Sequence, residues 1–349
     1  MHLKEGTTPP HAPKEGCTIM QVRFWGTRGS LPVAPHANTI ADKIASALVK
    51  SDGRQFADAS AARRFVDEEL EFSQGATYGG ATSCVEIDVG TGPFTVCDMG
   101  SGLRECGLDT LARTNDAQAD GVSRPKEWHF FLSHLHWDHI MGFPFFVPAF
   151  LENAKIIVHA GHGDAEQALR RQQEEISFPV PFDTLQADIT FRTLTPGREY
   201  RIGELDVSLV EQDHDHASYG YRFRDRAGRV AVYSTDAEHR VDADGSPEAI
   251  DDGTSALLAE ADLVIADTMY SLGESVSTKE GWGHSSNIVA VDLCREAGAR
   301  RLALFHHEPA YCDADIQRMH EETLRYEELT REGDPLEVLC AYDGLCVEL

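Results

Sequence analysis

The chain has 349 residues, of which 42% are hydrophobic and 26% are charged, and its formal net charge is −27. This composition is typical of a soluble globular protein, and no apolar stretch is long enough to span a membrane. A surface this acidic repels phosphate backbones, so polymeric nucleic acid is disfavoured as a partner, whereas a small anionic substrate stays compatible with a pocket that holds metal ions.

The N-terminal region divides into a leader and a first strand. Residues 1–19 contain three prolines, two glycines and no periodic apolar pattern, which predicts a disordered leader. Met20 to Trp25 read as a strand, and the glycines and prolines of residues 26–35 then turn the chain. We expect residues 20–349 to form a single domain.

Residues 39–72 have a different pattern. Apolar side chains recur at helical spacing, first at Ile40, Ile44 and Leu48 and then from Phe56 onward, with Ser-Asp-Gly at 51–53 as the break. We predict a helical insertion of two helices between early strands. It covers the active-site mouth or forms a subunit interface, as in a homodimer, and plain surface decoration is the alternative.

Strands resume after residue 78. Residues 84–89 and 94–98 are apolar runs separated by Gly-Thr-Gly-Pro, which predicts a hairpin. A tight loop at 98–102 and a short helix to about residue 112 follow. Polar residues 114–126 then lead into a buried strand at 128–132.

The rest of the chain alternates between strands and helices. Residues 143–150 are apolar but contain two prolines, so we expect a wall or loop there. Strands are expected at 155–159, 189–194, 205–211, 219–223, 230–234, 263–266, 301–305, 336–342 and 345–349, and helices at 164–175, 253–260, 285–296 and 313–330. Two strand-rich halves that close with helices predict an α/β fold of two face-to-face sheets with helices outside.

The segment 133–139, which directly follows the strand at 128–132, reads SHLHWDH. Its three histidines and one aspartate supply imidazole nitrogens and a carboxylate, which are ligands for zinc, manganese or iron. No cysteine lies among them, which disfavours a closed structural zinc site. A solvated polar turn is the alternative, and the metal interpretation is favoured because other segments agree with it.

Three later segments could complete a dinuclear site. Each places a metal-binding side chain just after a predicted strand. They offer His214 or His216, then Asp236, and last His306 or His307. A lone histidine is more often a surface residue than a ligand. Three such placements after an H-x-H-x-D-H motif favour a shared metal site.

The order of these motifs resembles the metallo-β-lactamase superfamily from Val22 to the C-terminus, apart from the insertion. The resemblance implies a four-layer αββα sandwich with two metal ions held at the edge between the sheets. The implied ligands are His134, His136 and His214 for one metal, Asp138, His139 and His306 for the other, and Asp236 between them. His214 is preferred because it lies six residues before Gly220, and His306 because it directly follows a strand; His216 and His307 stay open.

Three segments narrow the resemblance to the tRNase Z and phosphoribosyl cyclic phosphodiesterase group. They are FWGTRGS at 24–30, YGG followed by TSC at 78–84, and GHS at 283–285. Ala81 departs from that group, which usually has asparagine there, so a contact made by an asparagine side chain is missing. The long arm by which tRNase Z grips tRNA has no evident counterpart in this sequence.

Catalytic roles follow from this resemblance and from the chemistry of the residues. Asp138 could orient the attacking water through its free oxygen. His284 is a candidate general acid, held by Asp267, and the alternative for His284 is an inert residue at a helix start. Thr27, Arg28 and Ser30 are further candidates for substrate contact.

The expected function is therefore that of a dinuclear-metal-dependent hydrolase. We expect a phosphodiesterase that hydrolyses a small diester such as a cyclic nucleotide or cyclic phosphate. It should bind two divalent metal ions, with zinc as the preferred metal and manganese or iron as the alternatives. The alternatives are hydrolysis of a thioester, lactone or sulfate ester, an RNA-processing nuclease, and a non-catalytic sensor. The eight cysteines are scattered without a Cys-x-x-Cys pair, which together with the absence of a signal-peptide pattern predicts a cytoplasmic location without membrane binding.

Overall fold

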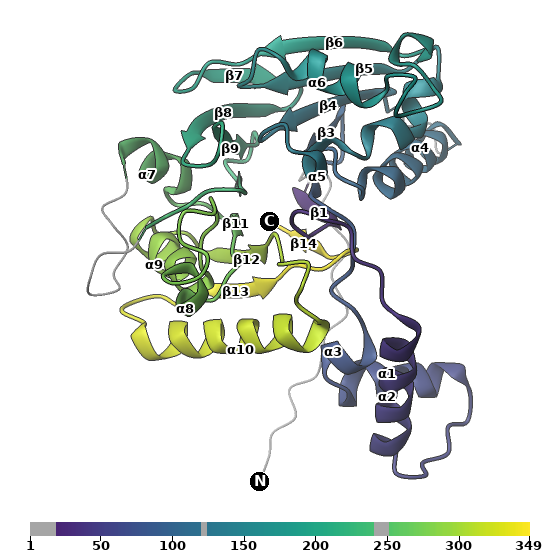
Figure 1. The fold of residues 1–349 in the computed structure, drawn as a ribbon, viewed down its shortest axis with the longest axis vertical. Coiled ribbons are helices and arrows are strands. Elements are labelled where there is room, and N and C mark those ends of the chain that lie inside the picture. Colours follow the sequence, from purple (N-terminus) through teal and green to yellow (C-terminus); the bar gives the residue numbers. More distant parts are fainter. Residues whose placement is uncertain (1–18, 120–123, 241–250) are drawn as a thin grey trace.

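Two seven-stranded sheets form the centre of the molecule (Figure 1). The computed structural model describes residues 19–119, 124–240 and 251–349. Apart from Ile19, the predicted leader therefore lies outside the described residues.

The first sheet has the strand order β14-β1-β2-β3-β4-β5-β6. Its strands are β1 (Gln21–Gly26), β2 (Cys84–Asp88), β3 (Phe94–Cys97), β4 (Glu127–Leu132), β5 (Lys155–Ala160), β6 (Asp188–Thr193) and β14 (Cys346–Glu348). The strands β2 and β3 pair antiparallel, as the predicted hairpin requires, and β3 to β6 run parallel. The parallel strands therefore end at one common edge.

The second sheet has the order β13-β12-β11-β10-β9-β8-β7. Its strands are β7 (Glu199–Ile202), β8 (Leu205–Gln212), β9 (Ser218–Arg224), β10 (Val230–Ser234), β11 (Leu263–Asp267), β12 (Arg301–Phe305) and β13 (Glu337–Cys340). The strands β10 to β13 are parallel, so they also end at one edge.

Apolar side chains from both sheets form one core between them. Phe24 of β1 and Phe131 of β4 meet Phe223 of β9 and Phe305 of β12 in this layer, and all four are fully buried. Alternation of inward and outward side chains along β1 buries one face of that strand. The two sheets therefore pack face to face.

Helices cover the outer faces of the sheets. The first sheet is covered by α4 (Leu103–Ala119), α6 (Ala165–Gln172) and the short turns η1 (Phe143–Phe145) and η2 (Val147–Phe150). The second sheet is covered by α7 (Asp252–Leu258), α9 (Asn287–Glu296) and α10 (Asp313–Thr330). Shorter helical turns are α5 (Trp137–Ile140), η3 (Phe182–Thr184) and α8 (Leu272–Ser275). This arrangement confirms the predicted four-layer αββα sandwich.

The insertion forms α1 (Ala37–Lys50), α2 (Ala59–Glu69) and the single turn α3 (Phe72–Gly75). Figure 1 shows α1 and α2 projecting beyond the sandwich near the start of α10. The ammonium of Lys43 fastens the insertion to the body, because it donates to the backbone oxygen of Ser73 and to Asp313 of α10. Along α1, by contrast, no residue is buried. Its role at the mouth or at an interface stays a prediction.

Five elements differ from the expectations. The helix α4 continues to Ala119, past the expected end near residue 112, because no proline interrupts the polar sequence before Pro125. The strand β6 joins the first sheet through β5 and is no part of the second run of strands. The strand β7 and the turn α8 were not expected. The last strand, β14, returns to the first sheet beside β1.

Among the described residues, no helix is both long enough and apolar enough to cross a membrane.

Candidate metal centre

The predicted ligands gather where strands of both sheets end. The segment 134–139 follows β4, whereas His214, Asp236 and His306 follow β8, β10 and β12. Because the sheets face each other, these ends meet at one edge of the sandwich. The structure brings all seven predicted ligands together there, in groups whose ligand atoms lie within 4.8 Å of one another.

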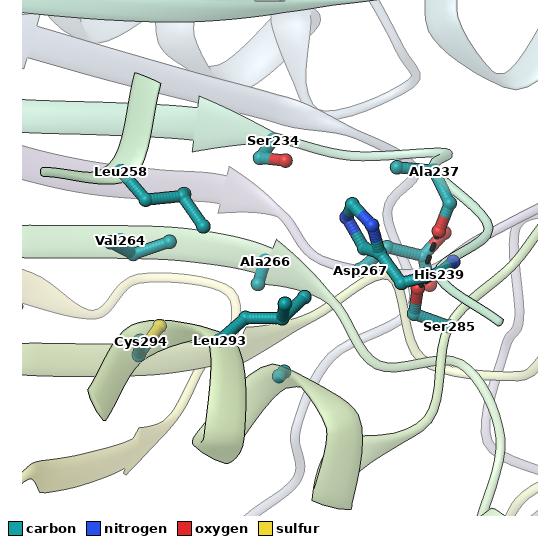
Figure 2. A pocket seen from close by; sticks show the side chains of 11 residues that line it. Ser234, Ala237, His239, Leu258, Val264, Ala266, Asp267, Ser285, Leu293 and Cys294 are labelled. Carbon is teal, nitrogen blue, oxygen red and sulfur yellow. Dashed lines mark hydrogen bonds between the residues drawn. The ribbon is translucent and has the colours of Figure 1, made fainter. Parts of the chain in front are cut away.

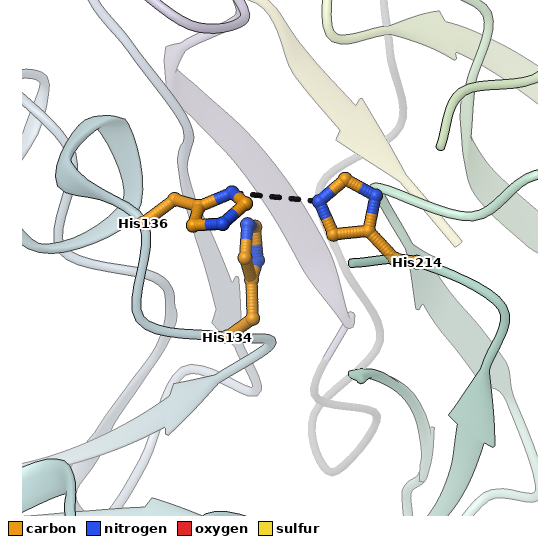
Figure 3. A group of neighbouring side chains, drawn as sticks. All are labelled: His134, His136 and His214. Atoms are coloured by element: carbon orange, nitrogen blue, oxygen red, sulfur yellow. Dashed lines mark hydrogen bonds between the residues drawn. The ribbon is translucent and has the colours of Figure 1, made fainter. Parts of the chain in front are cut away.

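The first group consists of three histidines. Figure 3 shows the rings of His134, His136 and His214 turned toward one another. The Nε2 atom of His214 lies 3.4 Å from Nδ1 of His136. The alternative ligand, His216, has a side chain that is 88% exposed, so it points away from this group.

The second group is Asp138, His139 and His306. Oδ2 of Asp138 lies 3.2 Å from Nε2 of His139 and 3.4 Å from Nε2 of His306. The alternative, His307, instead donates from Nε2 to the backbone oxygen of Ala341 at 2.8 Å. His307 is therefore part of the core and not of the group.

The carboxylate of Asp236 lies between the two groups. Its Oδ2 atom is 3.6 Å from Nε2 of His134 and 3.7 Å from Nε2 of His214. Its Oδ1 atom is 3.3 Å from Nε2 of His139 and 3.2 Å from Nε2 of His306. Each oxygen thus faces one group, which is the arrangement that a bridging carboxylate needs.

The donor set fits two divalent metal ions. It contains five imidazoles and two carboxylates and no thiolate, which suits zinc, manganese or iron in an open site. Nε2 of His134 is buried, faces this centre and has no hydrogen-bond partner. A buried polar atom without a partner is costly, and a metal ion would satisfy it. The residues present therefore fit the group that the superfamily implies.

Backbone strain marks the strand ends that carry these ligands. Asp98, Asp236 and His306 have φ values of 58°, 50° and 64°, which are unfavourable for residues with a Cβ atom. Each follows a strand by one or two residues. Such strain persists where the surrounding structure imposes it, and it is common at functional sites.

Asp98, which sequence reasoning treated only as a loop residue, orients one of the ligands. Its fully buried carboxylate accepts hydrogen bonds from Nδ1 of His139, from the hydroxyl of Ser133 and from the hydroxyl of Tyr233, each at 2.7 Å. Nε2 of His139 is therefore left facing the centre. A partner of this kind fixes the tautomer of a ligating histidine. The sequence could have indicated this role, because Asp98 directly follows β3 and so lies at the sheet edge that carries the candidate ligands.

Opposite charges determine the protonation of the centre. Burial alone would lower the pKa of His139, but the carboxylates of Asp138, Asp236 and Asp98 raise it well above its usual value. Burial likewise opposes ionisation of Asp236, whereas His306 and His139 lower its pKa. The carboxylates are thus held as anions, the form that binds cations.

The candidate acid, His284, lies beside the second group. Its Nδ1 donates to Oδ2 of Asp267 at 2.7 Å, and its ring stacks on that of His306 at 5.1 Å. Burial lowers the pKa of His284, but the carboxylate of Asp267 outweighs it and brings the pKa to about 9. The structure therefore pairs the two residues that sequence reasoning paired.

The segment Thr27 to Ser30 borders the centre. The guanidinium of Arg28 is buried and donates to the backbone oxygens of Gly79, Glu308 and Tyr311, so it holds three loop segments together. The hydroxyl of Thr27 is engaged with the backbone oxygen of Tyr78. Ser30, in contrast, donates its backbone N–H to Oδ2 of Asp138 at 2.7 Å. Thr27 and Arg28 thus make contacts within the protein, and their contacts with a substrate stay a prediction.

Two hollows adjoin these residues. A small cavity of about 20 Å³ is lined in part by Asp267, and Figure 2 shows the ring of His239 pointing into it. That volume is enough for one water molecule. A groove of about 830 Å³ runs along α6 and is lined by Leu135 and Trp137, which flank His136 in the sequence, but by none of the seven candidate ligands. The indole of Trp137 is 78% exposed there.

The sequence matches the family model of the β-lactamase superfamily domain over residues 105–307. The ribonuclease Z of Oceanobacillus iheyensis is 24% identical over 242 residues, which cover 55% of this chain and 74% of that protein. Among solved structures, unliganded yeast PDE1 matches with a TM-score of 0.62 and 14% identity, and the match covers 95% of this chain and 100% of that one. The short form of human tRNase Z matches with a TM-score of 0.54 and 18% identity, over 94% of this chain and 98% of that one.

The structural similarities show the shared fold, and the family model covers more than half of the chain. Together with the metal-binding motif at 134–139, they lead to one conclusion. The chain belongs to the metallo-β-lactamase superfamily of hydrolases.

Proposed function

We propose that this hydrolase is a dinuclear-metal-dependent phosphodiesterase that acts on a small diester, such as a cyclic nucleotide or a cyclic phosphate. The observation that carries the proposal is the position of Asp236, whose two oxygens face separate groups of ligands. The pair of His284 and Asp267 beside the second group supports it further.

The first group with one oxygen of Asp236 would hold one divalent ion, and the second group with the other oxygen would hold the second. Zinc suits this donor set best, and manganese or iron are the alternatives. When bound, two such ions supply positive charge that stabilises a phosphodiester transition state and activates water as a nucleophile.

The chain's own residues complete the reaction. Asp138 is held through Oδ2 by the backbone N–H of Ser30, so its other oxygen is the one that accepts a hydrogen bond from the attacking water. As water attacks phosphorus, it passes a proton to this oxygen of Asp138, and the bond to the leaving oxygen breaks. His284 donates its Nε2 proton to that oxygen while Asp267 holds Nδ1. A sugar alkoxide needs this proton because its conjugate acid has a pKa far above neutrality.

A small diester is favoured over RNA by charge. The chain carries a net charge of −27, which opposes the approach of a polyanion. An RNA-processing nuclease is the second candidate, and the ribonuclease Z relatives favour it. A thioester releases a thiolate, which departs without a proton, so a general acid at His284 supports that substrate less. Lactones and alkyl sulfate esters also release an alkoxide, so they stay alternatives that the substrate assays must separate from a diester.

A substrate panel tests the proposal. The zinc-loaded and the manganese-loaded enzyme would each be assayed with cyclic nucleotides, other cyclic phosphates, bis-p-nitrophenyl phosphate, a thioester, a lactone and a tRNA precursor. Asp138→Ala removes a proposed catalytic carboxylate, and Asp215→Ala, an exposed neighbour of His214, is its matched control. Hydrolysis of a cyclic phosphate that Asp138→Ala abolishes supports the proposal. Turnover of only the thioester, the lactone or the tRNA precursor would replace it.

The cellular setting belongs to the proposal as well. Among the described residues, seven cysteines are free and five of these are buried, which supports a reducing cytoplasm. A homodimer through the insertion is supported by the apolar side chains that α1 exposes.

A further inference from the structure

The carboxylate of Glu238 lies two residues beyond Asp236 and holds the turn that leads to His284. Its Oε1 accepts from the backbone N–H of Gly281 and its Oε2 from that of Gly283, each at 2.9 Å. The backbone N–H of Glu238 donates to the backbone oxygen of Asp213 at 2.8 Å, and Asp213 directly precedes His214. One residue thus joins three segments of the candidate centre.

The turn at 281–283 needs these contacts. Gly281 and Gly283 have φ values of 74° and 82°, so the chain there adopts a left-handed conformation that only glycine takes at low cost. A Cβ atom on Gly283 would lie 2.4 Å from Nδ1 of His214. Glycine therefore allows this turn to approach a predicted ligand closely. Hydrogen bonds to a carboxylate are stronger than those between neutral groups, so Glu238 stabilises the turn more than a neutral acceptor would.

The first consequence concerns His214. The backbone oxygen of Gly283 accepts a hydrogen bond from Nδ1 of His214 at 2.8 Å. This bond fixes the tautomer, so that Nε2 of His214 keeps its lone pair toward Asp236 and His136. A shift of Gly283 would release this ring.

The second consequence concerns His284, the residue directly after Gly283. Its ring must reach Asp267 on one side and His306 on the other. The path of the backbone through Gly283 sets the position of this ring. The hydrogen bonds of the Glu238 carboxylate go to the backbone of Gly281 and Gly283 and not to either imidazole.

We propose that Glu238 is a positioning residue, which sets the tautomer of His214 and the place of His284 through the turn at 281–283. This inference rests on the proposed function for its catalytic part, whereas its effect on metal binding is independent of the substrate.

The test compares Glu238→Gln with Glu280→Gln. Both remove one negative charge, but Glu280 is an exposed neighbour on the same loop. The glutamine at 238 keeps one acceptor and turns an amide N–H₂ toward a backbone N–H. Circular dichroism would check the fold of each variant.

Zinc binding gives the first measurement. Metal-free protein would be titrated with zinc against a chromophoric chelator. In Glu238→Gln, the affinity for one of two zinc ions should fall by about 10-fold or more, as expected when a residue that orients a ligand is lost. Glu280→Gln should bind both ions as the wild type does. Unchanged affinities for both ions in Glu238→Gln would overturn the role toward His214.

The dependence on the leaving group gives the second measurement. At saturating zinc, the kcat of Glu238→Gln on a 2′,3′-cyclic nucleotide should fall about 10-fold. On bis-p-nitrophenyl phosphate its kcat should fall about 2-fold or less, because that leaving group needs no acid. In a His284→Ala background, Glu238→Gln should cost about 2-fold or less on either substrate, because the two residues act as one unit. Equal losses on both substrates in both backgrounds would overturn the role toward His284.

A second variant covers the case in which Glu238→Gln does not fold. In Gly281→Ala the new methyl group meets open space but the φ of 74° becomes unfavourable, so the turn is disturbed while Glu238 is kept. We expect the same fall in zinc affinity and the same loss of kcat that depends on the leaving group. If the wild type hydrolyses neither diester, the proposed function fails, and the zinc titration alone then supports or overturns the positioning role.

Discussion

His284 and Asp267 form a hydrogen-bonded pair, with Nδ1 of the imidazole 2.7 Å from Oδ2 of the carboxylate. The two residues come from different segments, since Asp267 ends β11 and His284 precedes α9. The carboxylate fixes the tautomer of the ring and favours its charged form. The remaining nitrogen, Nε2, is the atom that can give a proton to a leaving oxygen.

Replacement of His284 by alanine should therefore have effects that depend on the leaving group. General acid catalysis is typically worth about 10²–10⁴-fold, and we expect a loss in that range on a cyclic nucleotide. On bis-p-nitrophenyl phosphate the loss should be far smaller, because p-nitrophenolate departs without a proton. Asp267→Asn should show the same asymmetry more weakly. Similar losses on both substrates would instead assign His284 to phosphate binding.

The metal content of the protein should be close to two ions per chain, because two groups of ligands share Asp236. Elemental analysis of protein purified without chelator measures this number. Asp236→Ala should reduce it to one or none, whereas the exposed control Asp215→Ala should leave it unchanged. Wild-type protein that holds one ion or none would contradict the dinuclear arrangement.

The insertion offers a test of assembly. Ile40, Ile44 and Leu48 follow one another at intervals of four along α1, and their side chains are 44%, 56% and 67% exposed. An apolar stripe of this kind is unfavourable in water and favours a partner surface. Ile44→Asp should therefore convert a homodimer to a monomer in light-scattering measurements, and Asn38→Asp on the same helix should not.

Deletion of residues 39–72 extends this test to the active-site mouth. The deletion should change the oligomeric state or the order of preference among diesters. If it changes neither, the insertion is surface decoration.

A pH dependence of stability is expected from His159. The ring is fully buried, and its Nε2 lies 2.9 Å from Nδ1 of His129. If both rings were protonated, both of these nitrogens would carry a hydrogen, and the two N–H groups would repel each other. Burial, followed by the charges of His129 and Arg192, lowers the pKa of His159 to about 3. An unfolded chain binds this proton below about pH 6.5, its ordinary value.

Between about pH 6.5 and pH 3 the unfolded state therefore binds more protons, and stability falls as the pH falls through this window. For metal-free protein, urea unfolding at pH 7 and pH 5 would measure the loss. His159→Gln should reduce that loss by about 2 kcal/mol, at about 1.4 kcal/mol for each pH unit. His216→Gln changes an exposed histidine and should leave the loss as in the wild type. An equal loss in both variants would show that His159 titrates normally.

Local patterns in the sequence were sufficient for most of the secondary structure. The helix α10 spans Asp313–Thr330 as expected, because acidic residues at its start and helical apolar spacing agree there. The hairpin of β2 and β3 likewise follows from Gly-Thr-Gly-Pro between two apolar runs. Contacts across the chain were harder to predict. The pairing of β14 with β1 joins residues more than 300 positions apart, and no local pattern encodes it.

The candidate site divides in the same way. The sequence by itself determined that 134–139 is the strongest candidate for a metal site, because four ligand-type side chains within six residues directly follow a strand. Only the tertiary structure separated His214 from His216 and His306 from His307, since the direction of each ring depends on local backbone angles such as the φ of 64° at His306. It also decided the contacts of Asp98 and Glu238. Glu238 acts on segments that follow different strands of the second sheet, so its partners become neighbours only when those strands pair. Asp98 also meets Tyr233 of the other sheet, which requires the two sheets to pack together, and the free energy of that packing is spread over the whole core.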